Sequence, residues 1–233
     1  MIGNSEPKVF VALDLDQPRD AEAIAESLSG LGLGFKLGPR LMLREGMALV
    51  RAIAKHGQVF VDCKHFDIPS TMESAVRAAF EAGASFSTIH TLAGPEALKK
   101  MAEVEAELNR ERAFRVLAVT ILTSFSQSSL PIHLKEIKIE NLVEALASES
   151  RANGIKSFVC SPHEAKRLRE VIPDSFLVTP GIRPEGSSKG DQVRIETPKA
   201  AKLAGSSALV VGRPILEAAD RRAMAEKILA DFT

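Results

Sequence analysis

The sequence predicts an α/β fold, a closed (β/α)₈ barrel formed as a single domain over residues 1–233. Three observations support this prediction. Short apolar runs alternate with helical patterns eight times without interruption. The runs are continuously apolar, as expected for strands that are covered on both faces. The chain length suits one closed barrel, although the pattern alone leaves an open doubly wound sheet as an alternative.

Each strand–helix unit is delimited by its apolar run and by the start and stop signals of its helix. The expected strands are Val9–Leu13, Phe35–Leu37, Gln58–Val61, Phe86–His90, Arg115–Val119, Ser157–Val159, Phe176–Val178 and Ala208–Val211. The expected helices are Asp20–Ser29, Arg40–Ala54, Ser70–Ala82, one from Pro95, Asn141–Asn153, one from Pro162, one from Pro198 to Gly205, and one from about Pro214 to Leu229. Gly83 is a good residue to end its helix, and Ser161 to Glu164 contains an N-cap, a first-turn proline and a capping-box glutamate.

The composition limits the classes of partner. Lys plus Arg and Asp plus Glu each total 30, so no long-range field draws the chain to nucleic acid or to an anionic membrane. The lack of Trp and Tyr argues against a surface that stacks bases. No apolar run approaches the roughly 20 residues of a membrane span, and residues 1–8 lack the features of a signal peptide. The only two cysteines, Cys63 and Cys160, do not suggest a disulfide, so we expect a cytoplasmic protein.

A charged motif follows the third predicted strand. Asp62 and Lys64 are two residues apart, so on a strand their side chains project from the same face. Asp67 follows where the chain leaves the sheet. Charged groups at the end of an apolar strand are costly to bury without a use. The motif therefore indicates a charged site on a rigid support, with a structural ion-pair network as the alternative.

Further polar residues are expected at the same end of the barrel, where the active sites of this fold lie. They are Asp14, Lys36, His90, Thr120, Thr123, Ser124, Arg183 and Arg213. The two arginines follow the seventh and eighth strands, where such barrels commonly bind phosphate, and Gly212 lets backbone amides approach an oxyanion closely. His90 has no evident acid–base partner, so we interpret it as a structural histidine at a strand end.

These motifs together resemble the orotidine 5′-monophosphate decarboxylase family along nearly the whole chain. The matching segments are Val11 to Asp14, Phe35 to Gly38, Asp62 to Thr71, Leu122 to Ser124, Thr179 to Pro184, Gly190 to Gln192 and Val211 to Pro214. Any one of these segments alone is weak evidence for the family, but together and in this order they are highly specific.

The resemblance implies a cofactor-free and metal-free decarboxylation of orotidine 5′-monophosphate to uridine 5′-monophosphate in de novo pyrimidine synthesis. Lys64 would be the proton donor. The implied catalytic residues are Lys64, Asp62, Asp67 and Lys36. The implied substrate-binding residues are Asp14, Lys36, Asp62, Ile68, Thr71, Thr123, Pro180, Arg183, Gln192, Gly212 and Arg213.

Finer roles also follow from the resemblance. Asp14 and Lys36 would hold the ribose hydroxyls, and Thr123 the pyrimidine. Gln192, Gly212 and Arg213 would bind the phosphate, with Arg183 at the base of the phosphate loop. A homodimer is implied, in which Asp67 and Thr71 reach the neighbouring subunit's site. The polar, glycine-containing segment from residue 181 to residue 192 is suited to be a lid over the phosphate.

Elementary chemistry agrees with these roles. Loss of carbon dioxide leaves an electron pair on a ring carbon without an adjacent electron sink, so a fixed positive charge such as Lys64 is needed. Asp62 would face the substrate carboxylate, and two like charges ~4 Å apart repel by about 4 kcal/mol at an effective dielectric constant of 20. Binding the remote phosphate can offset the cost of holding the substrate there.

Two other functions remain as alternatives. Related metal-dependent decarboxylases and aldolase-like synthases of sugar phosphates use a similar motif with magnesium, but a carboxylate is expected in their second strand, where this chain has Lys36. A nucleotide-binding protein without catalysis is the second alternative, because a fold does not fix a function.

Overall fold

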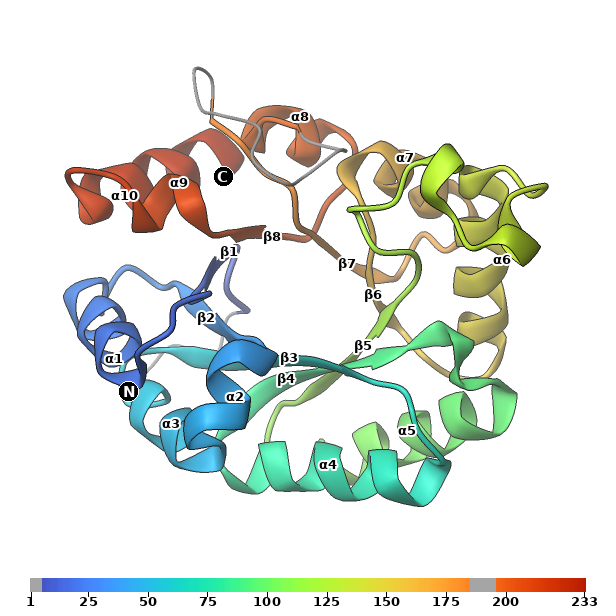
Figure 1. Ribbon diagram of the computed structural model, residues 1–233, viewed down its shortest axis with the longest axis horizontal. Helices are drawn as coiled ribbons and strands as arrows, with labels where there is room; N and C mark the ends of the chain where they lie inside the picture. The colour runs from blue at the N-terminus through green and yellow to red at the C-terminus, as the bar shows by residue number, and fades with distance from the viewer. Residues whose placement is uncertain (1–5, 185–195) are drawn as a thin grey trace.

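In the computed structural model, which describes residues 6–184 and 196–233, eight parallel strands close into a barrel in chain order (Figure 1). The strands are β1 (Val9–Ala12), β2 (Gly34–Leu37), β3 (Gln58–His65), β4 (Ala84–His90), β5 (Arg115–Val119), β6 (Ser157–Val159), β7 (Phe176–Thr179) and β8 (Ala208–Val211). Every neighbouring pair is parallel, and β1 pairs with β8. The predicted barrel is therefore confirmed, and the open sheet is excluded.

Helices surround the strands on the outside (Figure 1). They are α1 (Pro18–Ser27), α2 (Pro39–Glu45), α3 (Met47–Ile53), α4 (Pro69–Glu81), α5 (Pro95–Leu108), α6 (Ile139–Ala152), α7 (Pro162–Val171), α8 (Pro198–Leu203), α9 (Arg213–Leu216) and α10 (Arg221–Phe232). Several of them begin with proline, whose fixed φ suits the first helical turn and whose missing N–H costs nothing there. The capping box predicted for α7 contributes a hydrogen bond from the Ser161 N–H to the Glu164 carboxylate at 2.7 Å.

Two predicted helices were each wrong as a single element. The segment Arg40–Ala54 contains two helices, because Gly46 adopts φ 62°, a conformation that α-helices exclude. The predicted final helix is also divided, into α9 and α10. There the Asp220 side chain accepts a hydrogen bond from the Ala223 N–H at 2.9 Å and starts a new helix.

Aromatic rings pack inside the barrel near the N-terminal ends of the strands, which we call the closed end. Phe10 makes edge-to-face contacts with Phe60 and Phe86, with ring centroids 5.3 and 4.9 Å apart. A Cβ atom on Gly34 would lie 2.4 Å from the Phe10 ring, which explains a glycine inside a strand. A second, larger core fills the space between the strands and the helices.

The segment between β5 and α6 contains two short 3₁₀ turns, at Gln127–Ser129 and Ile132–Leu134. The Gln127 side chain donates to the carbonyls of Lys135 and Ile137 and accepts from the Ile139 N–H, each at 2.9 Å. One side chain thus organises this connection. Within residues 6–184 and 196–233, no helix is both long and apolar enough to cross a membrane.

Candidate active site

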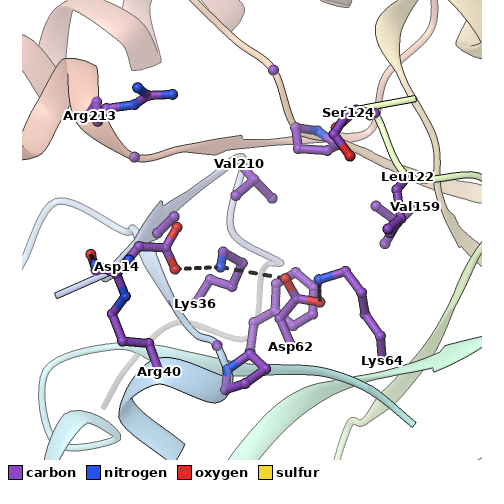
Figure 2. A pocket seen from close by; sticks show the side chains of 18 of the residues that line it. Asp14, Lys36, Arg40, Asp62, Lys64, Leu122, Ser124, Val159, Val210 and Arg213 are labelled. Carbon is purple, nitrogen blue, oxygen red and sulfur yellow. Dashed lines mark hydrogen bonds and ion pairs between the residues drawn. The ribbon is translucent and has the colours of Figure 1, made fainter. Parts of the chain in front are cut away.

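A cavity of about 680 Å³ opens at the C-terminal ends of the strands (Figure 2). Its lining comes from the strands β1, β2, β3, β6 and β8 and from the segments that follow them or follow β5 and β7. The predicted residues that line it are Asp14, Lys36, Asp62, Lys64, Thr123, Pro180, Arg183, Gly212 and Arg213. Most of the predicted site is therefore gathered around one cavity.

Four charged side chains alternate in sign along one wall of this cavity. The Lys36 ammonium lies 3.0 Å from Asp14 Oδ1 and 3.5 Å from Asp62 Oδ2. The Lys64 ammonium lies 2.9 Å from Asp62 Oδ1. We call Asp14, Lys36, Asp62 and Lys64 the charged row. Because the signs alternate along the row, each charge has an opposite charge beside it.

Burial and neighbouring charges act in opposite directions on the centre of the row. Burial disfavours the Asp62 carboxylate, but Lys36 and Lys64, together with hydrogen bonds from Lys64 and Thr88, hold the pKa of Asp62 below its usual value. Burial likewise disfavours the Lys36 ammonium, but Asp62 and then Asp14 outweigh it and raise the pKa of Lys36. Both groups are therefore charged at neutral pH.

Lys64 is held by an irregular end of β3. It has φ 49°, the only positive φ of a non-glycine residue in the described ranges. The pairing of β3 with β4 shifts register between Val61 and His65, and the Lys64 N–H donates to Thr88 Oγ1 at 2.9 Å. Asp62 and Lys64 do share a side of the strand, as predicted, but regular pleating does not produce this arrangement.

Basic residues lie on the opposite side of the cavity. Figure 2 shows Arg213, at the start of α9, across the cavity from Lys64. Arg183 is buried and donates to its neighbour, the Ile182 carbonyl, at 2.8 Å. An arginine follows β7 and another follows β8, which is the usual position of phosphate sites in this fold. Apolar side chains of Phe60, Val159 and Val210 also line the cavity.

Some predicted residues do not reach the cavity of their own chain. Asp67, Ile68 and Thr71 are exposed and absent from its lining. Asp67 Oδ1 accepts a hydrogen bond from the Ile68 N–H at 2.7 Å. Gln192 and most of the predicted lid lie outside the described residues.

Thr88 and Arg40 were not predicted as site residues. Thr88 is fully buried, and its hydroxyl donates to Asp62 Oδ1 at 3.0 Å. A threonine inside an apolar strand, two residues before a strand end, was the available signal for it. Arg40 lines the cavity mouth and donates to the Asp14 carbonyl at 3.3 Å. Its position in the first turn of the helix after β2 was the corresponding signal.

The contacts of His90 and Cys63 are those of structural residues. His90 Nδ1 accepts a hydrogen bond from the Leu92 N–H at 3.3 Å, and burial followed by the charge of Lys64 lowers the pKa of His90. Cys63 is half-buried against the outer core, and burial, with a contribution from Asp62, raises the pKa of its thiol. Among the described residues, no three His, Cys, Asp or Glu side chains cluster in a way that could hold a metal ion.

The fold and the cavity define a class: a (β/α)₈-barrel enzyme with a charged row facing a basic side. Comparison with known proteins identifies the family within this class. The sequence model of the "Orotidine 5'-phosphate decarboxylase / HUMPS family" matches residues 7–228. The chain therefore belongs to this family.

Individual relatives agree with the family match. The chain is 44% identical to an orotidine 5'-phosphate decarboxylase of Rhodopseudomonas palustris over 97% of this chain and 93% of that protein. It is 41% identical to one of Trichlorobacter lovleyi, over 97% and 95% of the two chains. The crystal structure of the Lactobacillus acidophilus orotidine 5'-phosphate decarboxylase superposes with a TM-score of 0.84 at 34% identity, covering 98% of this chain and all of that one.

Proposed function

We propose that the chain, as one catalytic domain over residues 1–233, converts orotidine 5′-monophosphate to uridine 5′-monophosphate and carbon dioxide without a cofactor. Membership of the family and the names of the relatives support the overall reaction. The charged row supports the mechanism most directly, because an ammonium beside a buried carboxylate faces an open cavity.

In the proposed reaction, the bond between the ring and its carboxylate breaks, and its electron pair remains on the ring carbon. Carbon dioxide leaves, and a proton from the Lys64 ammonium forms the new C–H bond. The neutral amine then regains a proton from solvent. A preorganised positive charge stabilises the developing carbanion without reorganisation at the moment of reaction.

The rest of the row keeps Lys64 and the substrate in place. Asp62 accepts from the Lys64 ammonium and would lie beside the substrate carboxylate, whose repulsion by Asp62 ends when carbon dioxide departs. Lys36 keeps Asp62 ionised and, with Asp14, would bind the ribose hydroxyls. Both lysines lower the pKa of Asp62, because a buried carboxylate without a charged partner takes up a proton instead.

Binding groups on the other side complete the proposal. Arg213 and the backbone at Gly212 would bind the phosphate, with Arg183 at the base of the loop and Thr123 and Pro180 beside the pyrimidine. The separation of Arg213 from Lys64 across the cavity fits a substrate whose phosphate lies at the end opposite its reacting carbon (Figure 2). Gln192 belongs to the same proposal but lies outside the described residues.

The magnesium-dependent alternative makes a contrasting prediction. A divalent metal prefers a set of oxygen ligands, whereas the Lys36 ammonium lies 3.5 Å from Asp62. We expect full turnover of orotidine 5′-monophosphate, followed by its absorbance, after exhaustive chelation. Loss of activity that magnesium restores would favour the alternative. Binding of uridine 5′-monophosphate without any turnover would instead identify a binding protein.

We also propose a homodimer with shared sites. Phe66 and Ile68 are 64% and 63% exposed on the two sides of Asp67, and exposed Thr71 follows them. Large apolar side chains around a charged residue are typical of a surface that a partner covers. In a two-fold dimer, the same segment of each chain would reach the other chain's cavity.

Mixed dimers test this sharing. Asp67→Asn and Lys64→Ala homodimers should both be nearly inactive. After exchange of subunits, about one working site per mixed dimer should appear, since one of its two sites receives both intact residues. Verified mixing without recovery of activity would contradict a site built across the interface.

A cytoplasmic location also stays a proposal. Neither Cys63 nor Cys160 forms a disulfide, which fits a reducing compartment.

A further inference from the structure

We propose that Thr88 is a positioning residue that fixes the backbone and the ammonium of Lys64 for proton transfer. This inference rests on the proposed function, because it assumes that Lys64 donates the proton. Thr88 does not line the cavity, so it would act through Lys64 and Asp62 and not on the substrate.

A closed ring of hydrogen bonds joins the three residues. The Thr88 hydroxyl accepts from the Lys64 N–H at 2.9 Å and donates to Asp62 Oδ1 at 3.0 Å. The same Asp62 oxygen accepts from the Lys64 ammonium at 2.9 Å. Lys64 is thus held at both ends, at its backbone and at its side-chain nitrogen. The hydroxyl has only one hydrogen, so donating it to Asp62 leaves the lone pairs for the Lys64 N–H.

The backbone of Lys64 needs such support. Its φ of 49° lies in the left-handed region, which residues other than glycine rarely adopt without compensating contacts. The register shift between Val61 and His65 interrupts the regular pairing of β3 with β4 at this point. The Thr88 side chain supplies the acceptor for the Lys64 N–H there. Backbone strain kept at a charged cavity wall is consistent with a functional constraint.

The location of Thr88 makes the ring rigid. Thr88 is fully buried within β4, and β-branched side chains have few χ1 states. Asp62 is faced by Lys36 from β2, by Lys64 from its own strand and by Thr88 from β4. Thr88 is the neutral member of this set, so removing its hydroxyl changes positions without removing a formal charge.

The test compares Thr88→Val, Thr88→Ser and Thr91→Val with the wild-type protein. Valine keeps the shape of threonine and removes the hydroxyl, whereas serine keeps the hydroxyl. Thr91 is a matched control, because it is also buried and its hydroxyl donates to the Val119 carbonyl at 3.0 Å, outside the ring. The measurements are kcat and KM for orotidine 5′-monophosphate, the Kd for uridine 5′-monophosphate, and a crystal structure of each variant.

We expect Thr88→Val to lower kcat by about 10- to 100-fold, the value of a hydrogen bond to a charged group. The Kd for uridine 5′-monophosphate should change by less than about threefold, because phosphate binding is remote. Thr88→Ser and Thr91→Val should stay within about threefold of wild type in kcat. In crystals of Thr88→Val, Lys64 should leave the positive φ region.

Several results would overturn the inference: a kcat for Thr88→Val within threefold of wild type, an equal loss in Thr91→Val, or no rescue by serine. If Thr88→Val does not fold, Thr88→Ala removes the same hydroxyl and replaces it in the comparison. If the wild-type protein does not decarboxylate the substrate, the proposed function fails. The Lys64 backbone in the crystals still decides whether Thr88 holds it.

Discussion

The two ends of the barrel are built from the same eight strands but have opposite characters. At the closed end the interior is filled by the rings of Phe10, Phe86 and Phe176, which bury apolar surface. The Arg115 guanidinium lies over the Phe176 ring, 4.7 Å from its centre, and pairs with Glu6. At the open end the same strands terminate in the charged row around a cavity. The difference indicates that tight apolar packing, at the closed end and between the strands and the helices, stabilises a barrel that holds costly buried charges at its open end.

Two carboxyl groups make the contrast concrete. Asp62 at the open end is buried, yet two lysines hold its pKa below the usual value. Glu105 lies on α5, outside the barrel and beside the start of β5. Its carboxylate accepts from the Val116 N–H at 3.2 Å, and burial outweighs its partners and raises its pKa to about 7. Burial acts in the same direction on both groups, so the neighbouring ammonium groups decide the difference.

The largest expected effect is at the open end. Lys64→Ala should lower kcat by about 10⁴-fold or more, because it removes both a proton donor and a fixed positive charge. The melting temperature should stay close to that of the wild type. Lys156→Ala, at an exposed lysine beside the closed end, is the control and should leave kcat unchanged. Near-normal turnover by Lys64→Ala would eliminate the assigned donor.

Arg213→Ala should come next, with KM raised by about 100-fold or more, because a charged partner of the phosphate is lost. The loss should disappear when the substrate is orotidine, which lacks the phosphate. Arg40→Ala, at the opposite side of the mouth, should raise KM by less than about tenfold. An equal loss with orotidine would argue against phosphate binding by Arg213.

Phe10→Leu should affect the closed end alone. It removes part of a packed ring cluster and should lower the free energy of unfolding by about 1–2 kcal/mol. Under conditions where the variant is folded, kcat should remain within about twofold. Urea denaturation and steady-state kinetics on one preparation provide both values. A large fall in kcat with unchanged stability would contradict the division between the ends.

The smallest expected effect is a pH dependence of stability. Because burial raises the folded pKa of Glu105 to about 7, above its ordinary value of 4.5, its stabilising contribution is complete below about pH 4.5 and is lost as the pH rises through 7. Glu105→Gln should therefore be more stable than wild type by about 2 kcal/mol at pH 8.5 and nearly equal to it at pH 4.5. Glu103→Gln, an exposed neighbour, should show no such difference. The same gap at both pH values would contradict the raised pKa.

The strands were predictable because continuous apolar runs and proline-started helices are local signals. The break at Gly46 was not, since a glycine inside a helical pattern is often tolerated and only tertiary packing selects its φ of 62°. Asp62 and Lys64 were found from spacing and motif. Thr88 was not, because its role depends on a register shift between strands, which single-sequence patterns do not encode. Whether Asp67 and Thr71 complete a site depends on a second chain, and that stays a prediction.

The most direct measurement is a crystal structure with a uridine 5′-monophosphate analogue in which nitrogen replaces the reacting ring carbon, at position 6. The nitrogen of Lys64 should then lie within hydrogen-bonding distance of that ring atom, about 2.7–3.2 Å, with the phosphate beside Arg213. An amine directed out of the cavity, or a nucleotide bound in the reverse orientation, would contradict the proposed proton transfer.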